Sequence, residues 1–205
     1  MSIRKTALAA LALFLTGAAQ ADVSANLGFA SDYHYRGIFQ APNSVSGGLD
    51  FEKSGFYAGT WAADVKDGLE LDGYFGYGGT VGDIGYSVGY TGYFYTGDFD
   101  DTYQELNLGT SYGLITVDVA LGQYDNFAGP TLDYTYYALT VEKDGFYGKY
   151  AGFSRDFAGE YFEAGFSTSI ADVDVGIAAI FANEDLVGTS DESLVLSIGK
   201  SFDLK

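Results

Sequence analysis

Apolar and polar side chains alternate along almost the whole chain after residue 21, and this period of two restricts the fold more than any other feature. The segment ITVDVALG, for example, places Ile115, Val117 and Leu121 on one face of an extended chain and Thr116 and Asp118 on the other. Successive side chains of a β-strand point to opposite faces, whereas an amphipathic helix repeats every 3.6 residues. The pattern therefore predicts an all-β protein whose strands each have one apolar and one polar face.

The first 21 residues have the pattern of a cleaved secretory signal peptide. Arg4 and Lys5 give a positive start, residues 6–15 form an apolar run, and residues 19–21 have the small-x-small pattern of a cleavage site. The apolar run is too short to cross a bilayer as a helix, so a retained anchor is the weaker alternative. We therefore expect a signal peptide at 1–21 and export through the periplasm, with 22–205 as one domain of 205 − 21 = 184 residues.

The composition favours strands joined by tight turns, arranged as a barrel in a membrane. The chain holds 18 Tyr, 16 Phe and 29 Gly but only 2 Pro, which favours strands over helices. The polar faces carry Gly, Ser and Thr with sparse charges, and the apolar faces end in Tyr and Phe, as in barrels with a lipid-facing band and a polar lumen. At roughly 15 residues for each strand and turn, the domain is predicted to be a transmembrane antiparallel up-and-down β-barrel of about 12 strands.

The connections between the expected strands alternate in length. Short ones read EKSG, VGDI, SYGL, EKDG and IAD, whereas the longer and more acidic ones read GIFQAPNS, TGDFDD, QYDNFAGP, RDFAGE and NEDLVGTSDE. The short connection VKDG is the exception on the long side. With the N-terminus on the periplasmic side, the short turns are expected to be periplasmic and the long loops extracellular, as in outer-membrane barrels.

One internal echo bears on the direction of two strands. The sequence EKSGFY recurs 90 residues later as EKDGFY, a spacing of about six strands and turns. Lys149 and Arg155 favour the interior for their face of the second strand. The echo would turn Tyr57 and Trp61 inward as well, and the sequence leaves the register of both strands open.

The stretch ASDYHYRGIFQ combines the single histidine with one of the few basic residues. On a strand, Asp32, His34 and Arg36 share one face, and Tyr33 and Tyr35 share the other. The polar face continues the interior face of the preceding residues, so the triad is interpreted as a structural clamp or, less strongly, as part of a pore wall. The two tyrosines are assigned to an aromatic girdle at the membrane interface.

Catalytic and metal-binding functions are poorly supported by the residues. The chain has one His, no Cys and no G-x-S-x-G motif, so an embedded lipid-modifying enzyme is only an outside alternative. The same counts argue against zinc, and the acidic loops do not match a calcium-binding loop. We expect no catalytic residue, no metal and no cofactor.

The charges on the expected interior face indicate a channel for small solutes. The formal net charge is −18, and loss of Arg4 and Lys5 makes the exported chain more acidic still, which argues against a nucleic-acid partner. An acidic lumen would favour cations. A structural or receptor barrel with a plugged lumen is the alternative, because 12 strands lie between small filled barrels and open porins. The candidate channel-lining residues are Asp32, His34, Arg36, Asp50, Glu70, Asp72, Glu105, Asp118, Lys149 and Asp174.

The sequence SDYHYRGIFQ resembles the opening signature of the TorF-type porins, also called the Gcw-chp family, although Phe39 stands where a small hydroxyl residue is usual. The resemblance continues through GGLDFEKSGFYAGTWAADV, LELDGYFGYGG and YQELNLGTSYG, while Ala62 and Ala63 depart from the Ser and Asn common there. It implies a channel role in the outer membrane of a Gram-negative bacterium, and it names no solute. The signature positions that match are Ser31, Asp32, Tyr33, Tyr35, Arg36, Gly37 and Gln40.

The C-terminal SIGKSFDL resembles the strand signal that barrel-assembly machinery reads. Ser197, Gly199, Phe202 and Leu204 fill its polar, glycine, aromatic and hydrophobic places, and the terminal Lys205 departs from the usual aromatic end. The resemblance implies that this machinery and outer-membrane lipid are partners of the chain.

Overall fold

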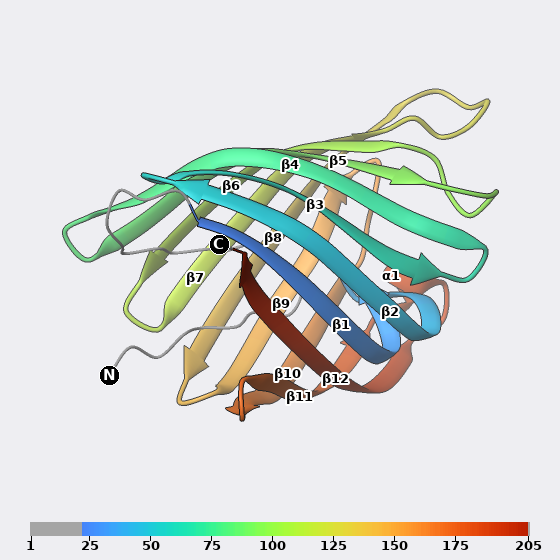
Figure 1. The fold of residues 1–205 in the computed structure, drawn as a ribbon. Coiled ribbons are helices and arrows are strands. Elements are labelled where there is room, and N and C mark those ends of the chain that lie inside the picture. Colours follow the sequence, from blue (N-terminus) through green and yellow to red (C-terminus); the bar gives the residue numbers. More distant parts are fainter. Residues whose placement is uncertain (1–21, 205) are drawn as a thin grey trace.

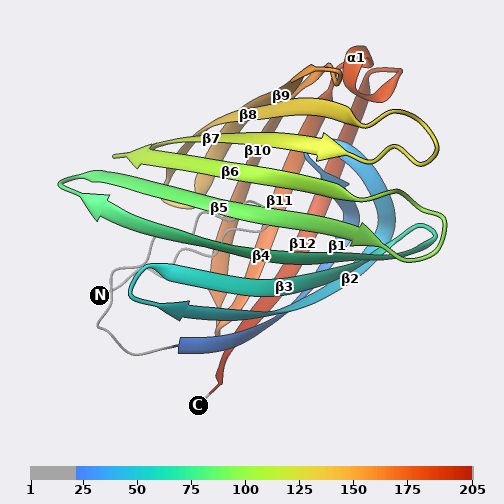
Figure 2. The same cartoon turned by 90° about the horizontal axis from the view of Figure 1, so that it is seen from above.

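The computed structural model describes residues 22–204, which form a closed barrel of 12 antiparallel strands (Figures 1 and 2). Each strand pairs with its neighbours in the sequence, and β1 pairs with β12 to close the sheet. The elements are β1 (Asp22–Tyr35), β2 (Ile38–Lys53), β3 (Phe56–Val65), β4 (Gly68–Val81), β5 (Ile84–Tyr95), β6 (Tyr103–Tyr112), β7 (Ile115–Tyr124), β8 (Leu132–Lys143), β9 (Phe146–Arg155), β10 (Glu160–Ile170), β11 (Val173–Ala182), α1 (Glu184–Val187) and β12 (Asp191–Leu204).

The predicted fold class and the expected strand number are confirmed. The expected signal peptide lies outside the described residues, and the cleavage position stays a prediction. Within residues 22–204, no helix is both long and apolar enough to cross a membrane.

The outer wall of the barrel is apolar, as the alternation predicts. Along β4, for example, Leu69, Leu71, Phe75 and Tyr77 are all exposed, and Glu70 between the first two is buried. The same pattern recurs on the other strands, so a continuous apolar surface surrounds the barrel. Closure of the sheet pairs every strand on both sides over much of its length, which removes most of the exposed backbone groups that an open sheet would carry.

The two ends of the barrel differ in their connections. At one end, which we call the short-turn end, two-residue turns occupy 54–55, 82–83, 113–114, 144–145 and 171–172. Ser54 and Gly55, like Asp144 and Gly145, have positive φ at both positions, which suits the tight turns that match strand twist. This repeated geometry explains the echo between EKSGFY and EKDGFY. The short connections of the sequence are thus confirmed.

The opposite end, which we call the long-loop end, carries connections over 96–102, 125–131, 156–159 and 183–190, the last containing α1. VKDG contributes a two-residue turn here, as expected. The prediction that GIFQAPNS is a long loop is wrong, because the chain turns at Arg36 and Gly37, with φ of 50° and 82°, and continues directly as β2. The positive φ of Asn43 marks an irregularity within that strand.

Aromatic side chains gather inside the barrel near the long-loop end. Tyr134 and Tyr161 are almost completely buried in this cluster, and Phe157, from the connection between β9 and β10, stacks on Tyr134 with ring centroids 4.8 Å apart. Leu186 of α1 packs against the same cluster. The interior at this level is therefore packed in part like a protein core.

Candidate functional site

The turn between β1 and β2 reaches across the interior of the barrel instead of staying in the wall. Its Arg36 forms a two-pronged ion pair with Glu105 of β6, in which Nη1 donates to Oε1 and Nη2 donates to Oε2 at 2.8 Å. In the barrel order β6 is separated from β2 by three strands, so this contact crosses the interior. A planar guanidinium suits a two-pronged bond to a carboxylate.

Glu105 is held by more donors than Arg36 alone. The Tyr134 and Tyr93 hydroxyls donate to it at 2.8 Å and 3.0 Å, and the Asn107 amide donates at 2.9 Å. The Tyr35 hydroxyl is a longer fifth partner at 3.4 Å. The Glu105 side chain has 0% exposure, and its charge is stable there because both oxygens are hydrogen-bonded and a cation is adjacent.

Arg36 and Gly37 also fit closely against the interior aromatic rings. The Arg36 guanidinium lies 4.0 Å from the centroid of the Tyr136 ring and 4.9 Å from that of Tyr35, in the range of cation–π contacts. A Cβ on Gly37 would lie 2.6 Å from the Tyr161 ring. Since its φ is also positive, glycine is the residue this turn requires.

Two further acidic residues, Glu70 and Asp72, lie on the interior face of β4. Glu70, only 1% exposed, accepts a hydrogen bond from the Tyr33 hydroxyl at 2.6 Å. Glu70 Oε2 and Asp72 Oδ1 are buried without a hydrogen-bond partner among the described residues. Among residues 22–204, no group of three or more His, Cys, Asp or Glu side chains is arranged to hold a metal.

The assignment of Tyr33 and Tyr35 to an interfacial girdle is wrong, because their hydroxyls bond to the interior carboxylates Glu70 and Glu105. The cause is that β1 leaves the wall after Ala30, where its ladder with β12 ends, so the face that alternation assigned to lipid lies against the interior carboxylates. Alternation in the sequence therefore assigns the wrong face to the tyrosines at the end of β1.

His34 and Asp32 lie apart from the Arg36–Glu105 pair. His34 Nε2 lies 3.1 Å from Ser193 Oγ, and its ring packs edge-on against Phe39. A hydrolytic Ser–His pair needs a group that orients the other ring nitrogen, and His34 Nδ1 has no hydrogen-bond partner among the described residues. Asp32 accepts a bond from the Ser31 hydroxyl at 3.3 Å.

The remaining candidate residues face the interior closer to the short-turn end. Asp50 accepts hydrogen bonds from Asn26, at 3.0 Å, and from Tyr74. Asp118 approaches Gly109 on the neighbouring strand, and Asp174 is paired in register with Gly199. Together these residues give this half of the interior a polar, mostly acidic lining.

Lys149 pairs with Glu163 of β10 at 3.4 Å, and Tyr147 donates to the same carboxylate at 2.5 Å. Sequence reasoning missed Glu163. The signal in EYFEAGF was usable, because Glu163 directly follows the exposed Phe162 and therefore lies on the other face of the strand. The direction of Trp61, which the sequence left open, is inward, since its ring packs against the buried Tyr33 ring. The tyrosines around Glu105 were also missed, because their meeting depends on contacts across the barrel.

The positions of the proposed assembly signal divide between the two faces of β12. Phe202 and Leu204 are exposed on the outer wall, and Ser197 and Gly199 pair with Ala30 and Gly28 of β1 at the closure of the barrel. Their recognition by assembly machinery stays a prediction.

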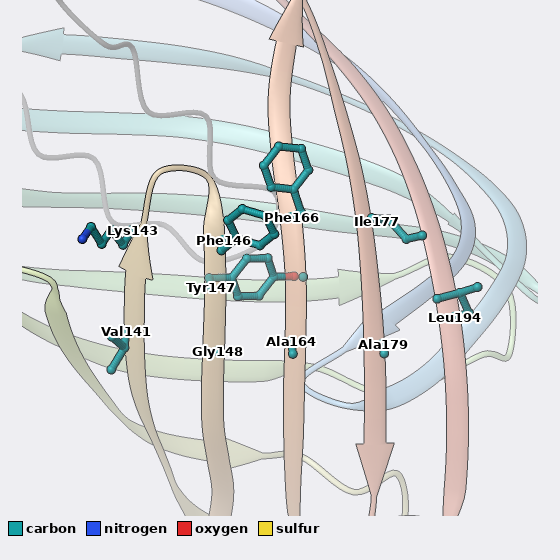
Figure 3. Close-up of a pocket in the computed structure, with 11 residues that line it drawn as sticks. Val141, Lys143, Phe146, Tyr147, Gly148, Ala164, Phe166, Ile177, Ala179 and Leu194 are labelled. Carbon is teal, nitrogen blue, oxygen red and sulfur yellow. The ribbon is translucent and has the colours of Figure 1, made fainter.

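A groove crosses the outer wall of the barrel over β8 to β12 (Figure 3). Its floor is a row of small residues in register, Gly148, Ala164 and Ala179. Phe146 and Phe166 stand along one side. The groove has a volume of ≈ 580 Å³ and belongs to the apolar outer surface rather than to the interior.

Comparison with known proteins identifies a family. A family model described as "Bacterial protein of unknown function (Gcw_chp)" matches residues 15–192. A search among curated proteins finds no match to the sequence.

Solved structures share the barrel architecture. A structure described as "Unveiling the Mechanism Behind the in-meso Crystallization of Membrane Proteins" is 11% identical with a TM-score of 0.57, over 89% of this chain and 84% of that one. OccK2 (OpdF) of Pseudomonas aeruginosa, in complex with glucuronate, is 14% identical with a TM-score of 0.42, over 86% and 61%. A BenF-like porin from Pseudomonas fluorescens Pf-5 is 11% identical with a TM-score of 0.42, over 82% and 57%. This chain thus spans about three-fifths of the length of those two proteins, and the likeness of the first concerns the fold alone.

Proposed function

The chain belongs to the bacterial Gcw_chp family, and we propose that this member is an outer-membrane channel for the passive diffusion of small solutes. The observation that carries the proposal is the division of the barrel into two surfaces. The outer wall is a continuous apolar surface, whereas Asp50, Asp118, Lys149 and Asp174 lie on the interior face. A lipid-facing band around a polar interior is the arrangement of outer-membrane channels.

The proposed location follows from the same surfaces together with the signal-peptide pattern. The exported chain would reach the outer membrane of a Gram-negative bacterium through the periplasm, and barrel-assembly machinery would read the end of β12. The short-turn end would then face the periplasm. The protein should fractionate with outer membranes and migrate faster unboiled than boiled in SDS gels, and recovery as a soluble periplasmic protein would contradict the proposal.

Conductance of the purified protein in planar bilayers tests the channel itself. We expect discrete current steps that depend on the folded barrel and disappear when the same sample is boiled before addition. A boiled sample is the matched control, since it carries the same detergent and any co-purified contaminant that survives heating. The proposal would be contradicted if folded, heat-modifiable protein gave no current steps, and gave none after its interior contacts had been released either.

Cation preference is the finer part of the proposal. Interior carboxylates outnumber Arg36 and Lys149, and low-dielectric walls concentrate the field of fixed charges, so cations should be enriched inside. The Debye length falls from about 10 Å at 0.1 M salt to about 3 Å at 1 M, so the preference should weaken as salt rises. Reversal potentials across salt gradients measure it, and anion preference in dilute salt would contradict it.

A structural or receptor barrel with a plugged lumen is the second candidate, and the crossing turn favours it. Arg36 and the aromatic cluster occupy the interior near the long-loop end. A permanently plugged barrel would give no current under any condition. The two candidates therefore differ in whether the turn can leave the interior.

A further inference from the structure

We propose that residues 31–45, the end of the β1–β2 hairpin, form a movable flap that closes the barrel, and that the Arg36–Glu105 pair is the latch that holds it shut. The inference rests on the proposed channel function and assigns the regulation of that channel to a named segment. It follows from how the segment is paired, where it is held and what its release would expose.

The flap lacks the sheet pairing that fixes the rest of the wall. The ladder between β1 and β12 ends at Ala30 and Ser197, although β12 continues to Asp191 and remains paired with β11. On the other side, the ladder between β2 and β3 ends at Ser46 and Ala63. Between these limits β1 and β2 form ladders only with each other. An isolated two-stranded hairpin is marginally stable in water, so this segment depends on other contacts for its position.

The base of the flap contains the irregularities expected of a hinge. Asn43 has a φ of 53°, and the pairing of β1 with β2 shifts in register after Tyr33. Near the base, the Ser44 hydroxyl donates to the Asp64 carbonyl oxygen at 2.7 Å. Hinges consist of a few residues that absorb changes of backbone dihedral angles. The chain thus bends inward where it leaves the wall.

Most polar contacts of the flap tip converge on two interior carboxylates, and His34 adds a contact with Ser193 of β12. Arg36 pairs with Glu105, and Tyr35 donates to the same carboxylate, whereas Tyr33 donates to Glu70. Gly37 lies against Tyr161 on β10. Loss of the Glu105 charge would leave Arg36 buried without its counter-ion, which strongly disfavours the closed position. The open position instead exposes the guanidinium to water.

Release of the flap would open the interior near the long-loop end. The latch spans from the turn to β6, and β8 and β10 contribute the rings around it. Glu105 retains Tyr93, Tyr134 and Asn107 as donors without Arg36. The carboxylate would therefore remain hydrogen-bonded in the open state, which makes two stable positions of the flap possible.

The first experiment compares single-channel currents of the unmodified protein with those of Glu105→Gln. The substitution keeps the shape of the side chain and removes its charge. We expect the open probability to rise by about tenfold or more, since removal of the ion pair favours only the open position. Asp133→Asn is the matched control, because Asp133 also pairs with an arginine, Arg155, but at 3.8 Å and with both side chains about half exposed.

The second experiment locks the flap with a disulfide and does not depend on the folding of the Glu105 variant. The chain has no cysteine, so Gly37→Cys with Tyr161→Cys introduces one defined pair. A Cβ on Gly37 lies 3.0 Å from Tyr161 Cβ, close to the separation of about 3.5–4.5 Å that a disulfide needs. We expect oxidation of the double variant to abolish openings and reduction to restore them. Because a Cys at position 37 is strained by its positive φ and would meet the Tyr161 ring if that ring remained, the reduced double variant is the reference, and Tyr161→Cys alone should respond to neither treatment.

The outcomes separate the flap from the channel. A higher open probability in Glu105→Gln but not in Asp133→Asn, together with closure by the disulfide, supports the latch. Steady currents that neither Glu105→Gln nor a disulfide verified by gel shift alters would overturn the latch and leave the channel function standing. Absence of current from every folded variant, reduced or oxidised, would overturn the channel function and the latch with it.

Discussion

Two tight hairpin turns at the long-loop end behave in opposite ways. The turn at Lys66 and Asp67, between β3 and β4, is exposed at the rim, whereas the turn at Arg36 and Gly37 lies inside the barrel. Both have two residues, so turn length does not explain the difference. β4 stays paired with β5 as far as Glu70, and Thr96 bonds Leu69 next to the turn. The ladders beside the flap end at Ala30 and Ser46, and beyond them the neighbouring strands reach it only through side-chain contacts, such as those of Ser31 with Leu196 and of Ser44 with Asp64.

Lateral pairing therefore decides whether a hairpin end is part of the wall. A hairpin that is paired on both sides almost to its tip must follow the curvature of the barrel. One that loses both neighbours can bend, and its position is then set by side-chain contacts.

Removal of the latch carboxylate should cost the most stability. Breaking a buried ion pair by deleting one partner costs about 3–5 kcal/mol. We expect Glu105→Ala to lower the unfolding free energy by about 3 kcal/mol, at the lower end of that range, because the flap can carry Arg36 into water. Urea unfolding in detergent micelles measures the change. Asp133→Ala, which removes the exposed partner of Arg155, should cost at most about 1 kcal/mol, and equal losses in the two variants would contradict the assigned difference.

Chemical labelling should distinguish the two turns directly. With no native cysteine, Ile38→Cys reports on the flap and Asp67→Cys on the exposed turn. Ile38 is partly buried against the interior aromatic cluster, so we expect a maleimide to react at least about tenfold more slowly at position 38, where full access needs local opening. The Glu105→Gln substitution should narrow this difference by accelerating position 38 alone. Similar rates at both positions without that substitution would show that the flap is not held inside.

Much of the wall could be predicted from the sequence, because its physics is local. Alternation fixed the outward side chains of β4, and tight-turn residues marked the short-turn end. These features depend on a few consecutive residues and on the period of an extended chain. The direction of Trp61 stayed open, because the echo was the one indication that it points inward.

The latch could not be predicted in the same way. Arg36 and Glu105 are 69 residues apart, and their meeting depends on closure of the barrel and on the loss of lateral pairing beside the flap. Because β1 leaves the wall after Ala30, both tyrosines that alternation had turned toward lipid reach the interior instead. A candidate site that is assembled across a barrel therefore required the topology before its residues could be paired.

The hydrogen bond from Tyr33 to Glu70 should make a smaller contribution than the latch. Hydrogen bonds to charged groups contribute about 1.5–3 kcal/mol, so Tyr33→Phe should lower the unfolding free energy by about 1.5 kcal/mol. Tyr35→Phe is the control and should cost less, because its hydroxyl lies 3.4 Å from Glu105. The single tryptophan, Trp61, has its ring centroid 5.7 Å from that of Tyr33. Its fluorescence should therefore change in Tyr33→Phe and stay the same in Tyr35→Phe. A change in Tyr35→Phe but not in Tyr33→Phe would contradict these hydrogen-bond and ring contacts.

The smallest effect is expected at the exposed turn. Lys66→Ala removes a cation from the same end of the barrel as Arg36, but Lys66 is exposed and the pairing of β3 with β4 reaches Val65 and Gly68 without it. Surface substitutions of this kind change stability by less than about 0.5 kcal/mol, and the open probability should stay at that of the unmodified protein. If Lys66→Ala raised the open probability as much as Glu105→Gln, the charge of the whole rim would control the current. Lys66→Ala leaves every ladder and the Arg36–Glu105 pair intact. If it opened the channel equally well, the distinction between a hairpin held by its neighbours and one held by a latch would fail.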